Sequence, residues 1–299
     1  MTHTSVLLNE VISGLDIKPD EVCLDGTING GGHSEAMLRQ LGSNGIIVGL
    51  DLDGKALEKA KVRLSGGKAQ VILKQISFRN LDTALIDSEI KSVNKIILDL
   101  GLSSNQFEES GRGFSFQKDE PLLMTFNNNP KGEELTARKI VNEWDEENIA
   151  QIIESYGEER FAKKIAHAIV FTRGKSEIKT TTDLVKIIKE AVPKKYQTGR
   201  IHPATKTFQA LRITVNDEIG ALKDGLVRGF KSLSDKGRMA IISFHSIEDR
   251  IVKRYFKELS IEKQGKLITK KPITPTQEEE NMNPRSRSAK LRIIEKISK

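Results

Sequence analysis

Three aspartates and a histidine stand at positions where a folded chain could use them for chemistry. Asp25 is followed by Gly-Thr-Ile-Asn-Gly-Gly-Gly and His33, and Asp51 and Asp99 each come at or next to the end of an apolar segment. Glycines let the backbone approach a ligand closely, and the first N–H groups of a helix attract negative charge. A strand-end carboxylate can accept hydrogen bonds from two adjacent ribose hydroxyls. This pattern indicates a nucleoside-binding site that also holds an anionic or zwitterionic group.

The spacing of the glycines favours one nucleoside cofactor over another. No G-x-G-x-x-G register exists between Gly26 and Gly32, so the dinucleotide fingerprint is missing and S-adenosylmethionine is favoured over NAD. Two alternatives stay open at this point, because such a turn can be a tight connection without a ligand and a strand-end aspartate can cap a helix. His33 can likewise be a ligand contact or a structural hydrogen-bond donor.

The elements that must position these residues alternate between strand and helix. The sequence predicts a strand that begins at Val22 and runs into the glycine turn, and a helix over 55–64. It predicts further strands over 46–50, 71–73, 95–100 and 238–244. Alternating strands and helices imply a parallel sheet, whose ligands bind beyond the carboxyl ends of the strands. Asp25, Asp51 and Asp99 should therefore converge on one edge.

The alternation stops between about residues 106 and 205, where the sequence predicts helices and loops but no strand. Pro193 ends the last of these helices, and from Thr205 to Leu233 apolar residues at steps of three and four predict one long helix returning to the sheet. Ser246 and Asp249 then resemble a capping box that opens another helix.

The chain ends in two strand candidates, 267–274 and 289–297, that suit an antiparallel hairpin. The predicted fold is therefore α/β, a seven-stranded Rossmann-like class I methyltransferase sheet with an inserted all-helical domain. The expected domains are a methyltransferase domain in two parts, 1–105 and 206–299, and a substrate-recognition domain over 106–205.

Composition narrows the function classes. The chain has 299 residues, a formal charge of +7, a pI near 9.3 and a single cysteine, Cys23, within the first strand. The charge indicates affinity for polyanions, and one cysteine permits neither an intramolecular disulfide nor a cysteine metal cluster. We expect no bound metal. Without a run of 18 apolar residues or a secretory leader, we expect a cytoplasmic protein that does not contact membranes.

Candidates for orienting a substrate amino group follow the fourth and fifth strands. They are Asp99, Ser103, Ser104 and His245. These groups are hydrogen-bonding groups rather than nucleophiles, and methyl transfer to an amine needs mainly alignment and removal of water. The serines could instead simply start a loop, and the histidine could be structural.

Candidates for contacting RNA are basic and aromatic. They are Arg112, Phe114 and Phe116 in one loop, His202, Lys206 and Arg212 after the predicted insertion, and Arg285 and Arg287 near the C-terminus. Arginine beside aromatics is typical of loops that stack an unpaired base. Such aromatics also fold back into a core, the histidine segment could be a helix-capping hinge, and a basic run can be a solvated face.

Ordered motifs along nearly the whole chain resemble those of the ribosomal RNA small-subunit methyltransferase H family. The motifs are His3-x-x-Val-Leu-Leu-x-Glu10, Asp25-Gly-Thr with Gly31-Gly-His-Ser34, Asp51-x-Asp53, Asp99-Leu-Gly-x-Ser-Ser104, Arg112-Gly-Phe-Ser-Phe116, Tyr156-Gly-Glu-Glu-Arg-Phe161, His202-Pro-Ala-Thr-x-Thr-Phe-Gln-Ala-Leu-Arg212, Ser243-Phe-His-Ser-x-Glu-Asp-Arg250 and Asn283-Pro-Arg-x-Arg-Ser288. The resemblance implies methylation of the exocyclic N4 of a decoding-region cytidine in small-subunit (16S) rRNA by S-adenosylmethionine. It also implies a substrate within the assembled or nearly assembled 30S particle, and we expect a monomer or homodimer.

The resemblance implies a set of cofactor contacts, which fall on Gly31, Gly32, His33, Asp51, Phe78, Asp99 and Gln106. Phe78 would pack on the adenine. The chain departs from the family where Leu123 and Thr125 replace an acid and an arginine, and where Asn105 replaces a proline. These departures keep open a second interpretation, an RNA-binding assembly factor with weak catalysis. A nucleotide-dependent oxidoreductase is a third, which the missing dinucleotide fingerprint disfavours.

Overall fold

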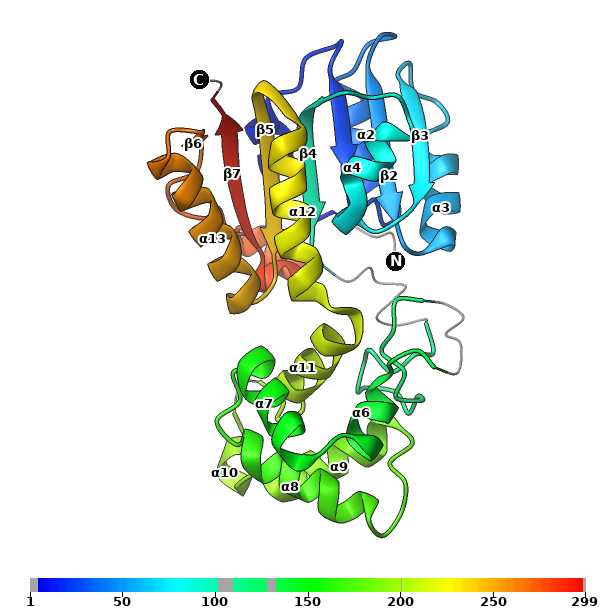
Figure 1. Cartoon of the computed structure of the whole chain (residues 1–299), viewed down its shortest axis with the longest axis vertical. Coiled ribbons are helices and arrows are strands. Elements are labelled where there is room, and N and C mark those ends of the chain that lie inside the picture. The colour runs from blue at the N-terminus through cyan, green and yellow to red at the C-terminus, as the bar shows by residue number, and fades with distance from the viewer. Residues whose placement is uncertain (1–4, 102–109, 128–132, 200, 298–299) are drawn as a thin grey trace. The chain divides into compact units, whose positions relative to one another are not determined.

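The computed structural model describes residues 5–101, 110–127, 133–199 and 201–297. The chain forms two compact units, shown in Figure 1. Unit 1 comprises Met1–Gly101 together with Ile219–Lys299, and unit 2 comprises Leu102–Glu218. Among the described residues, no helix is both long enough and apolar enough to cross a membrane.

Unit 1 is built on a seven-stranded sheet with the order β3-β2-β1-β4-β5-β7-β6. The strands are β1 (Val22–Asp25), β2 (Ile46–Asp51), β3 (Gln70–Gln75), β4 (Val93–Asp99), β5 (Leu233–Ser243), β6 (Gly265–Leu267) and β7 (Lys290–Lys296). Strands β1 to β5 pair in parallel, and β7 is antiparallel to both of its neighbours. The predicted seven-stranded Rossmann-like sheet and the parallel direction of its first five strands are confirmed.

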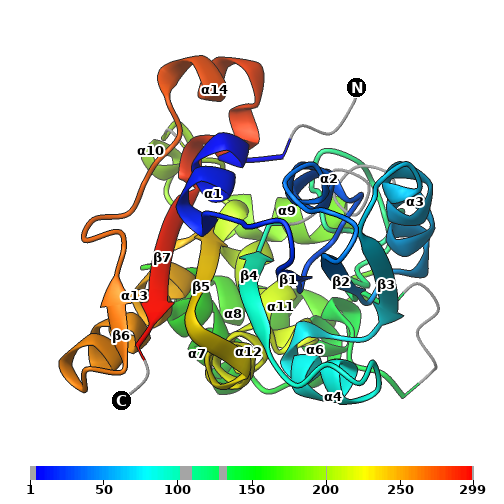
Figure 2. The same cartoon turned by 90° about the horizontal axis from the view of Figure 1, so that it is seen from above.

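Helices cover both faces of this sheet, as Figure 2 shows. One face carries α1 (Leu8–Leu15), α2 (Gly32–Leu38) and α3 (Gly54–Leu64), and the other carries α4 (Leu81–Ile86), α12 (Glu218–Ser232) and α13 (Ser246–Ile261). Each face has its own apolar cluster, which removes both sides of the parallel strands from water. The remaining short helices are η1 (Phe78–Asn80), α14 (Gln277–Met282) and η2 (Pro284–Ser288).

The predicted final hairpin forms, but its first strand is misplaced. Strand β6 ends at Leu267, where the predicted strand begins, and Ile273 forms only an isolated bridge with Leu291. Pro272 and Pro275 lie in this segment and have no N–H to donate to a ladder, which explains why the apolar pattern does not become a strand.

Unit 2 is helical over the residues that the structure describes, apart from loops and one isolated bridge. Its helices are α6 (Ala137–Glu143), α7 (Glu146–Gly157), α8 (Ala162–Arg173), α9 (Thr181–Ala191), α10 (Lys194–Gln197) and α11 (Thr205–Asn216). The apolar faces of these helices meet in one core, in which Ile153, Ile165 and Ile188 are fully buried. Helix α11 contributes Phe208 and Leu211 to the same core, so it packs with the helices that precede it.

The single long helix predicted from Thr205 to Leu233 is wrong, because the chain breaks between α11 and α12. Asp217 adopts a left-handed conformation with φ of 45°, which aspartate tolerates better than most residues. The side chain of Asn216 donates to the Met124 carbonyl and accepts from the Phe126 N–H, at 2.8 Å each. These contacts with a distant loop end helix α11 at Asn216, although the apolar periodicity alone predicts that the helix continues.

Candidate active site

Three carboxylates lie at the carboxyl edge of the sheet of unit 1. Asp25, Asp51 and Asp99 are the last residues of β1, β2 and β4, and all three side chains are buried. In the parallel register, Asp25 lies opposite Gly49 of β2 and Ile97 of β4, so the two other aspartates come two residues further along their strands. The predicted convergence of these aspartates is confirmed.

The glycine turn between β1 and α2 has a shape that a side chain would disturb. Gly31 has φ of +78°, and a Cβ there would lie 3.3 Å from the Ala60 backbone. A Cβ on Gly32 would lie 2.0 Å from the Ser5 hydroxyl oxygen. A Cβ at Gly32 would therefore require the Ser5 hydroxyl to move, and the left-handed backbone at Gly31 favours glycine.

Asp51 is held in place by the backbone and keeps capacity for a ligand. Its Oδ2 accepts from the Asn29 N–H and its Oδ1 from the Asp53 N–H, each at 2.9 Å. A carboxylate offers about four acceptor positions, so it can still accept from hydroxyl groups. Burial raises the pKa of Asp51 to about 6, while the backbone donors oppose this shift. The group is therefore ionised near neutral pH.

Asp99 is the carboxylate whose proton affinity is raised most. Its Oδ1 accepts from the Gly101 N–H at 3.2 Å, and its own N–H donates to the Thr27 hydroxyl at 2.6 Å. Burial raises the pKa of Asp99 to about 7, and the negative charge of Glu248 adds to the effect. A carboxyl group with such a pKa can both accept and release a proton near neutrality.

Asp25 and His33 are both held in place by hydrogen bonds within unit 1. Asp25 accepts from the Ser34 hydroxyl at 2.7 Å and from the Thr27 N–H at 3.1 Å, and burial raises its pKa to about 6. His33 Nε2 lies 3.0 Å from the Val6 carbonyl oxygen, so this nitrogen must carry the proton. Its Nδ1 then faces Asp99 Oδ2 at 3.8 Å, and burial lowers the pKa of His33.

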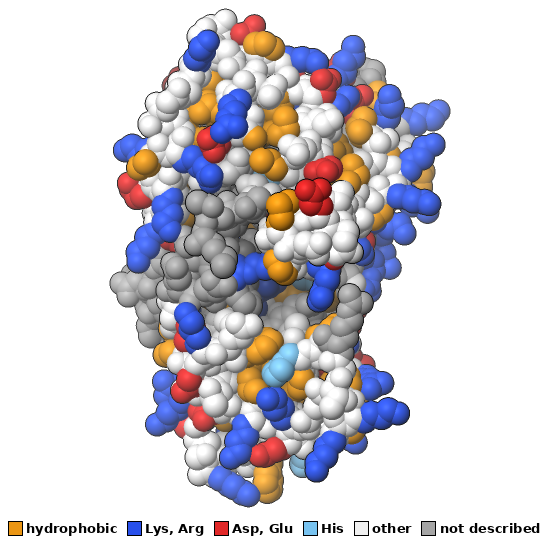
Figure 3. Space-filling view, turned by 180° about the vertical axis from the view of Figure 1, so that it is seen from behind, with side chains coloured by type: hydrophobic (Ala, Val, Ile, Leu, Met, Phe, Trp, Pro, Cys, Tyr) orange, Lys and Arg blue, Asp and Glu red, His pale blue; other side chains and the backbone are white. Residues whose placement is uncertain are grey.

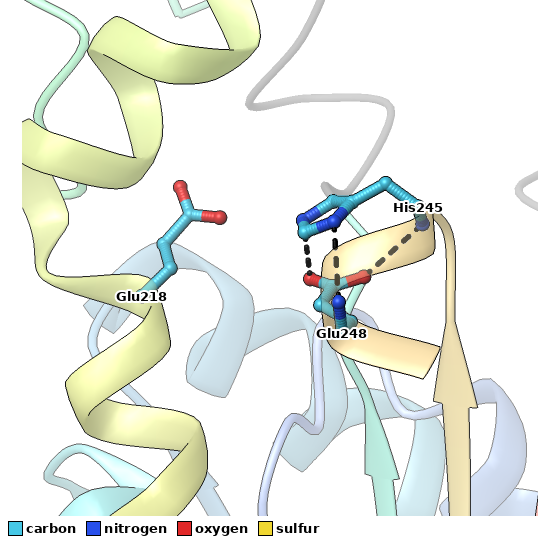
Figure 4. Close-up of side chains that lie close together, drawn as sticks. All are labelled: Glu218, His245 and Glu248. Atoms are coloured by element: carbon cyan, nitrogen blue, oxygen red, sulfur yellow. Dashed lines mark hydrogen bonds and ion pairs between the residues drawn. The ribbon is translucent and has the colours of Figure 1, made fainter. Parts of the chain in front are cut away.

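His245 caps helix α13, which corrects the predicted capping box of Ser246 and Asp249. Its Nδ1 accepts from the Glu248 N–H at 3.3 Å, and Glu248 Oε2 accepts from the His245 N–H (Figure 4). The same Oε2 accepts from the Phe244 N–H at 2.9 Å. The box lies one residue earlier than predicted because His245 is the last extended residue, with φ of −139°. Its Nδ1 thus has a structural role, and the role of His245 in orienting a substrate amino group stays a prediction.

Phe78 lies directly after β3 and packs against two glycines. A Cβ on Gly26 would lie 3.0 Å from Phe78 Cβ, and one on Gly225 of α12 would lie 2.6 Å from Phe78 Cδ2. The ring is partly buried beside the second apolar cluster of the sheet. Ser103, Ser104 and Gln106 lie outside the described residues, so their predicted roles stay predictions.

Several residues predicted to contact RNA make internal contacts in unit 2. Arg112 is buried and donates to the carbonyls of Thr125 and Phe126 at 2.9 and 2.8 Å. Phe114 is buried in the helical core. The ring of Phe116 stacks on that of His202, with centroids 4.5 Å apart. The loop aromatics are therefore folded inward, as the alternative interpretation allowed.

The other predicted RNA contacts lie in α11 and in η2. Lys206 donates to the Glu158 carbonyl at 2.7 Å, and Arg212 forms a two-pronged ion pair with Glu218 at 2.7 and 2.8 Å. Arg285 and Arg287 are exposed in η2. Exposure alone leaves these two arginines as predictions.

Sequence reasoning missed the groups that hold the carboxylates in place. Thr27 links β1 to β4 by accepting from the Asp99 N–H, and Ser34 fixes Asp25. Glu248 adds a negative charge near Asp99 from α13. The motifs Asp25-Gly-Thr27 and His33-Ser34 were the sequence signals for Thr27 and Ser34. Glu248 could be found only from the fold.

These residues fit S-adenosylmethionine. A ligand with a ribose and two positive groups suits an edge of buried carboxylates, and the glycine turn lets the backbone come close to it. The sheet order, with an antiparallel seventh strand, and this acidic edge define a class I S-adenosylmethionine-dependent methyltransferase.

Comparison with known proteins gives the family. The model of the MraW methylase family matches residues 1–297. Proteins named "Ribosomal RNA small subunit methyltransferase H" are 46% identical in Clostridium botulinum (strain Kyoto / Type A2) and 43% identical in Heliobacterium mobile, each over 99% of both chains. The chain belongs to the MraW methylase family.

One solved structure is also similar over most of the chain. The "putative rRNA-methylase from Clostridium thermocellum" is 13% identical and covers 99% of this chain and 100% of its own, with a TM-score of 0.47. This score is too low to support an inference, and the assignment rests on the sequence family.

Proposed function

We propose that this protein transfers the methyl group of S-adenosylmethionine to the exocyclic N4 of a cytidine in the decoding region of small-subunit (16S) rRNA. The observation that carries the proposal is the edge of three buried carboxylates after β1, β2 and β4. Membership of a methylase family and the names of relatives at 43 to 46% identity support the reaction and the substrate class.

The cofactor would be held by the groups around the glycine turn. Asp51 would accept from the ribose hydroxyls, Gly31 and Gly32 would allow close approach of the backbone, and Phe78 would pack on the adenine. His33 would lie beside the cofactor, fixed in orientation by the Val6 carbonyl. When bound, S-adenosylmethionine supplies an electrophilic methyl group on a sulfonium.

The chain's contribution to the reaction is orientation and proton removal. Methylation of an amino nitrogen releases a proton, and Asp99 has a pKa of about 7, near the value that suits a general base at neutral pH. Ser103 and Ser104 follow in the chain and remain candidates for orienting the amino group. Cys23 is buried in β1, and burial raises its pKa to about 12, which disfavours a covalent mechanism through this thiol.

The substrate context belongs to the same proposal. Unit 2 and the segments around it would recognise RNA within the assembled or nearly assembled 30S particle, in the cytoplasm. The working domain assignment is a methyltransferase domain of 1–105 and 206–299 with a recognition domain of 106–205, acting as a monomer or homodimer.

A complementation experiment tests the proposal in cells. We expect the target cytidine to lack its methyl group in a strain without this gene and to regain it with the wild-type gene. Asp99→Ala should not restore it, although the variant protein accumulates to the same level. Restoration by Asp99→Ala would remove Asp99 from the mechanism.

The departures at Leu123 and Thr125 support one other candidate, an RNA-binding assembly factor with weak catalysis. Thr125 is buried, and its carbonyl accepts from Arg112, so the segment has a structural role without the family's charged side chains. A fully methylated cytidine in the deletion strain, together with an assembly defect, would favour this candidate.

A further inference from the structure

Unit 2 carries a cluster of exposed cations on half-buried aromatic rings that the proposed reaction does not use. We call Arg160, Phe161, Lys164 and Tyr196 the Arg160 patch. It lies where α7 passes into α8 and where α10 packs beside them. Since Arg112, Lys206 and Arg212 are engaged by acceptors of the chain itself, cations elsewhere must contribute to binding a polyanion.

The geometry of the patch fixes an arginine against two rings. The Arg160 guanidinium carbon lies 4.8 Å from the centroid of the Phe161 ring and 4.8 Å from that of the Tyr196 ring. The two rings meet edge to face with centroids 4.9 Å apart, and Lys164 Nζ lies 5.9 Å from the Phe161 centroid. A guanidinium resting on a ring face keeps its N–H groups directed outward for an oxyanion.

A buried acid holds this arrangement together. Glu159 is buried, its Oε2 accepts from the Tyr196 hydroxyl, and its Oε1 accepts from the Phe161 N–H at 2.9 Å. The Tyr196 ring and the Phe161 backbone are therefore tied to one carboxylate, and the two rings in turn restrict Arg160. A cation held in place before binding loses less conformational entropy when it meets its partner.

Two lysines of the patch region occupy positions that do not stabilise helix α8. Lys163 and Lys164 stand in the first turn of α8, which contains no acidic residue, and the positive end of a helix disfavours cations. Lys194 and Lys195 lie in the single turn of α10, and all four of these lysines are exposed. Within the part of the chain that the structure describes, no carboxylate forms an ion pair with Arg160.

On the face of unit 2 that Figure 3 shows, lysine and arginine side chains lie among acidic ones. A solvated face needs neither a ring-bound arginine nor lysines at the start of a helix. A polyanion would offset both the repulsion between these cations and the unfavourable position of Lys163 and Lys164 at the start of α8.

We propose that the Arg160 patch, with Lys163, Lys194 and Lys195 beside it, binds the phosphate backbone of the substrate RNA. This inference rests on the proposed function, because it assigns a binding surface to the same substrate. Arg160 contacts a phosphate through outward N–H groups, and the lysines add charge along the strand. The patch contributes affinity and leaves the chemistry at Asp99 untouched.

Steady-state methyl transfer to small ribosomal subunits from a strain lacking the gene tests the inference. For Arg160→Ala we expect the KM for subunits to rise about fivefold to tenfold, as removal of a charged phosphate contact implies. The kcat and the affinity for S-adenosylhomocysteine should not change. Lys175→Ala is the matched control, because Lys175 lies 4.1 Å from the Phe171 ring centroid beyond the other end of α8.

Salt dependence and a second variant separate RNA binding from a folding defect. The slope of log affinity against log salt for protein-free 16S rRNA should become shallower by about one in Arg160→Ala. Lys163→Ala/Lys164→Ala removes only exposed side chains and should raise KM without lowering the melting temperature, because neither lysine is favourable at the start of α8.

The outcomes are distinct. An unchanged KM and salt slope in both variants would overturn the inference while leaving the proposed function in place. Weaker binding to whole subunits with unchanged binding to protein-free rRNA would overturn it in favour of a protein partner. Absence of methyl transfer by the wild-type protein would instead refute the proposed function.

Discussion

Replacing Asp99 with asparagine should make the protein more stable at alkaline pH. In the folded chain the pKa of Asp99 is about 7, against an ordinary value of 3.8, because the carboxylate is buried. Between these two pH values the folded state keeps a proton that the unfolded state has lost, so stability falls as pH rises toward 7. An asparagine is neutral at every pH and can still accept from the Gly101 N–H.

The magnitude follows from the shift. The contribution of Asp99 changes by about 1.4 kcal/mol per pH unit below its folded pKa, and levels off above it. From about pH 5.5 to about pH 8, the wild-type protein should therefore lose about 2 kcal/mol that Asp99→Asn does not lose. Asp25, Asp51 and His33 titrate in both proteins, so their contributions largely cancel in the comparison.

Urea unfolding at the two pH values measures this difference. The one tryptophan, Trp144, lies in unit 2, so hydrogen exchange of the β4 amides is the better reporter for unit 1. The gap in unfolding free energy between variant and wild type should widen by about 2 kcal/mol at the higher pH. A gap that is the same at both pH values would show that Asp99 does not titrate near neutrality, and would refute its role as a base.

Three further predictions concern single side chains. Asp51→Ala should weaken S-adenosylhomocysteine binding by about 1 to 3 kcal/mol in calorimetry, because it removes a buried charged acceptor. Gly225→Ala should lower stability by about 1 to 3 kcal/mol in thermal unfolding, since its Cβ would overlap the Phe78 ring. Arg112→Ala should destabilise unit 2 by about 2 to 3 kcal/mol, followed by Trp144 fluorescence, because two carbonyls lose a charged donor.

Each of these predictions has a matched control in the chain. Asp20→Ala changes an exposed aspartate at the other end of β1 and should leave cofactor affinity as it is. Gly66→Ala places a Cβ in open space and should not destabilise. Lys175→Ala removes an exposed cation of unit 2 without loss of stability. Equal effects in a variant and its control would contradict the corresponding assignment.

The carboxyl edge of the sheet was predictable because its signals are local. An apolar run that ends in an aspartate marks both a buried strand and its carboxyl end, so Asp51 and Asp99 could be placed once the parallel alternation was recognised. The glycine turn could also be predicted, because glycine is the residue that most readily adopts a positive φ such as that of Gly31.

Other features depend on contacts between distant segments. The helix break at Asp217 is set by bonds from Asn216 to a loop some 90 residues away. The cap at His245 rather than Ser246 depends on where the strand geometry ends. The burial of Arg112 follows from carbonyls that only the folded loop brings together. No periodicity in the sequence encodes these tertiary choices.

The most direct test of the proposed function is methyl transfer in vitro. Labelled S-adenosylmethionine is incubated with the protein and small subunits from a strain lacking the gene, and the rRNA nucleosides are identified by mass spectrometry. We predict that the label appears as N4-methylcytidine and that Asp99→Asn loses this activity. No incorporation by a preparation that binds S-adenosylhomocysteine would contradict the account.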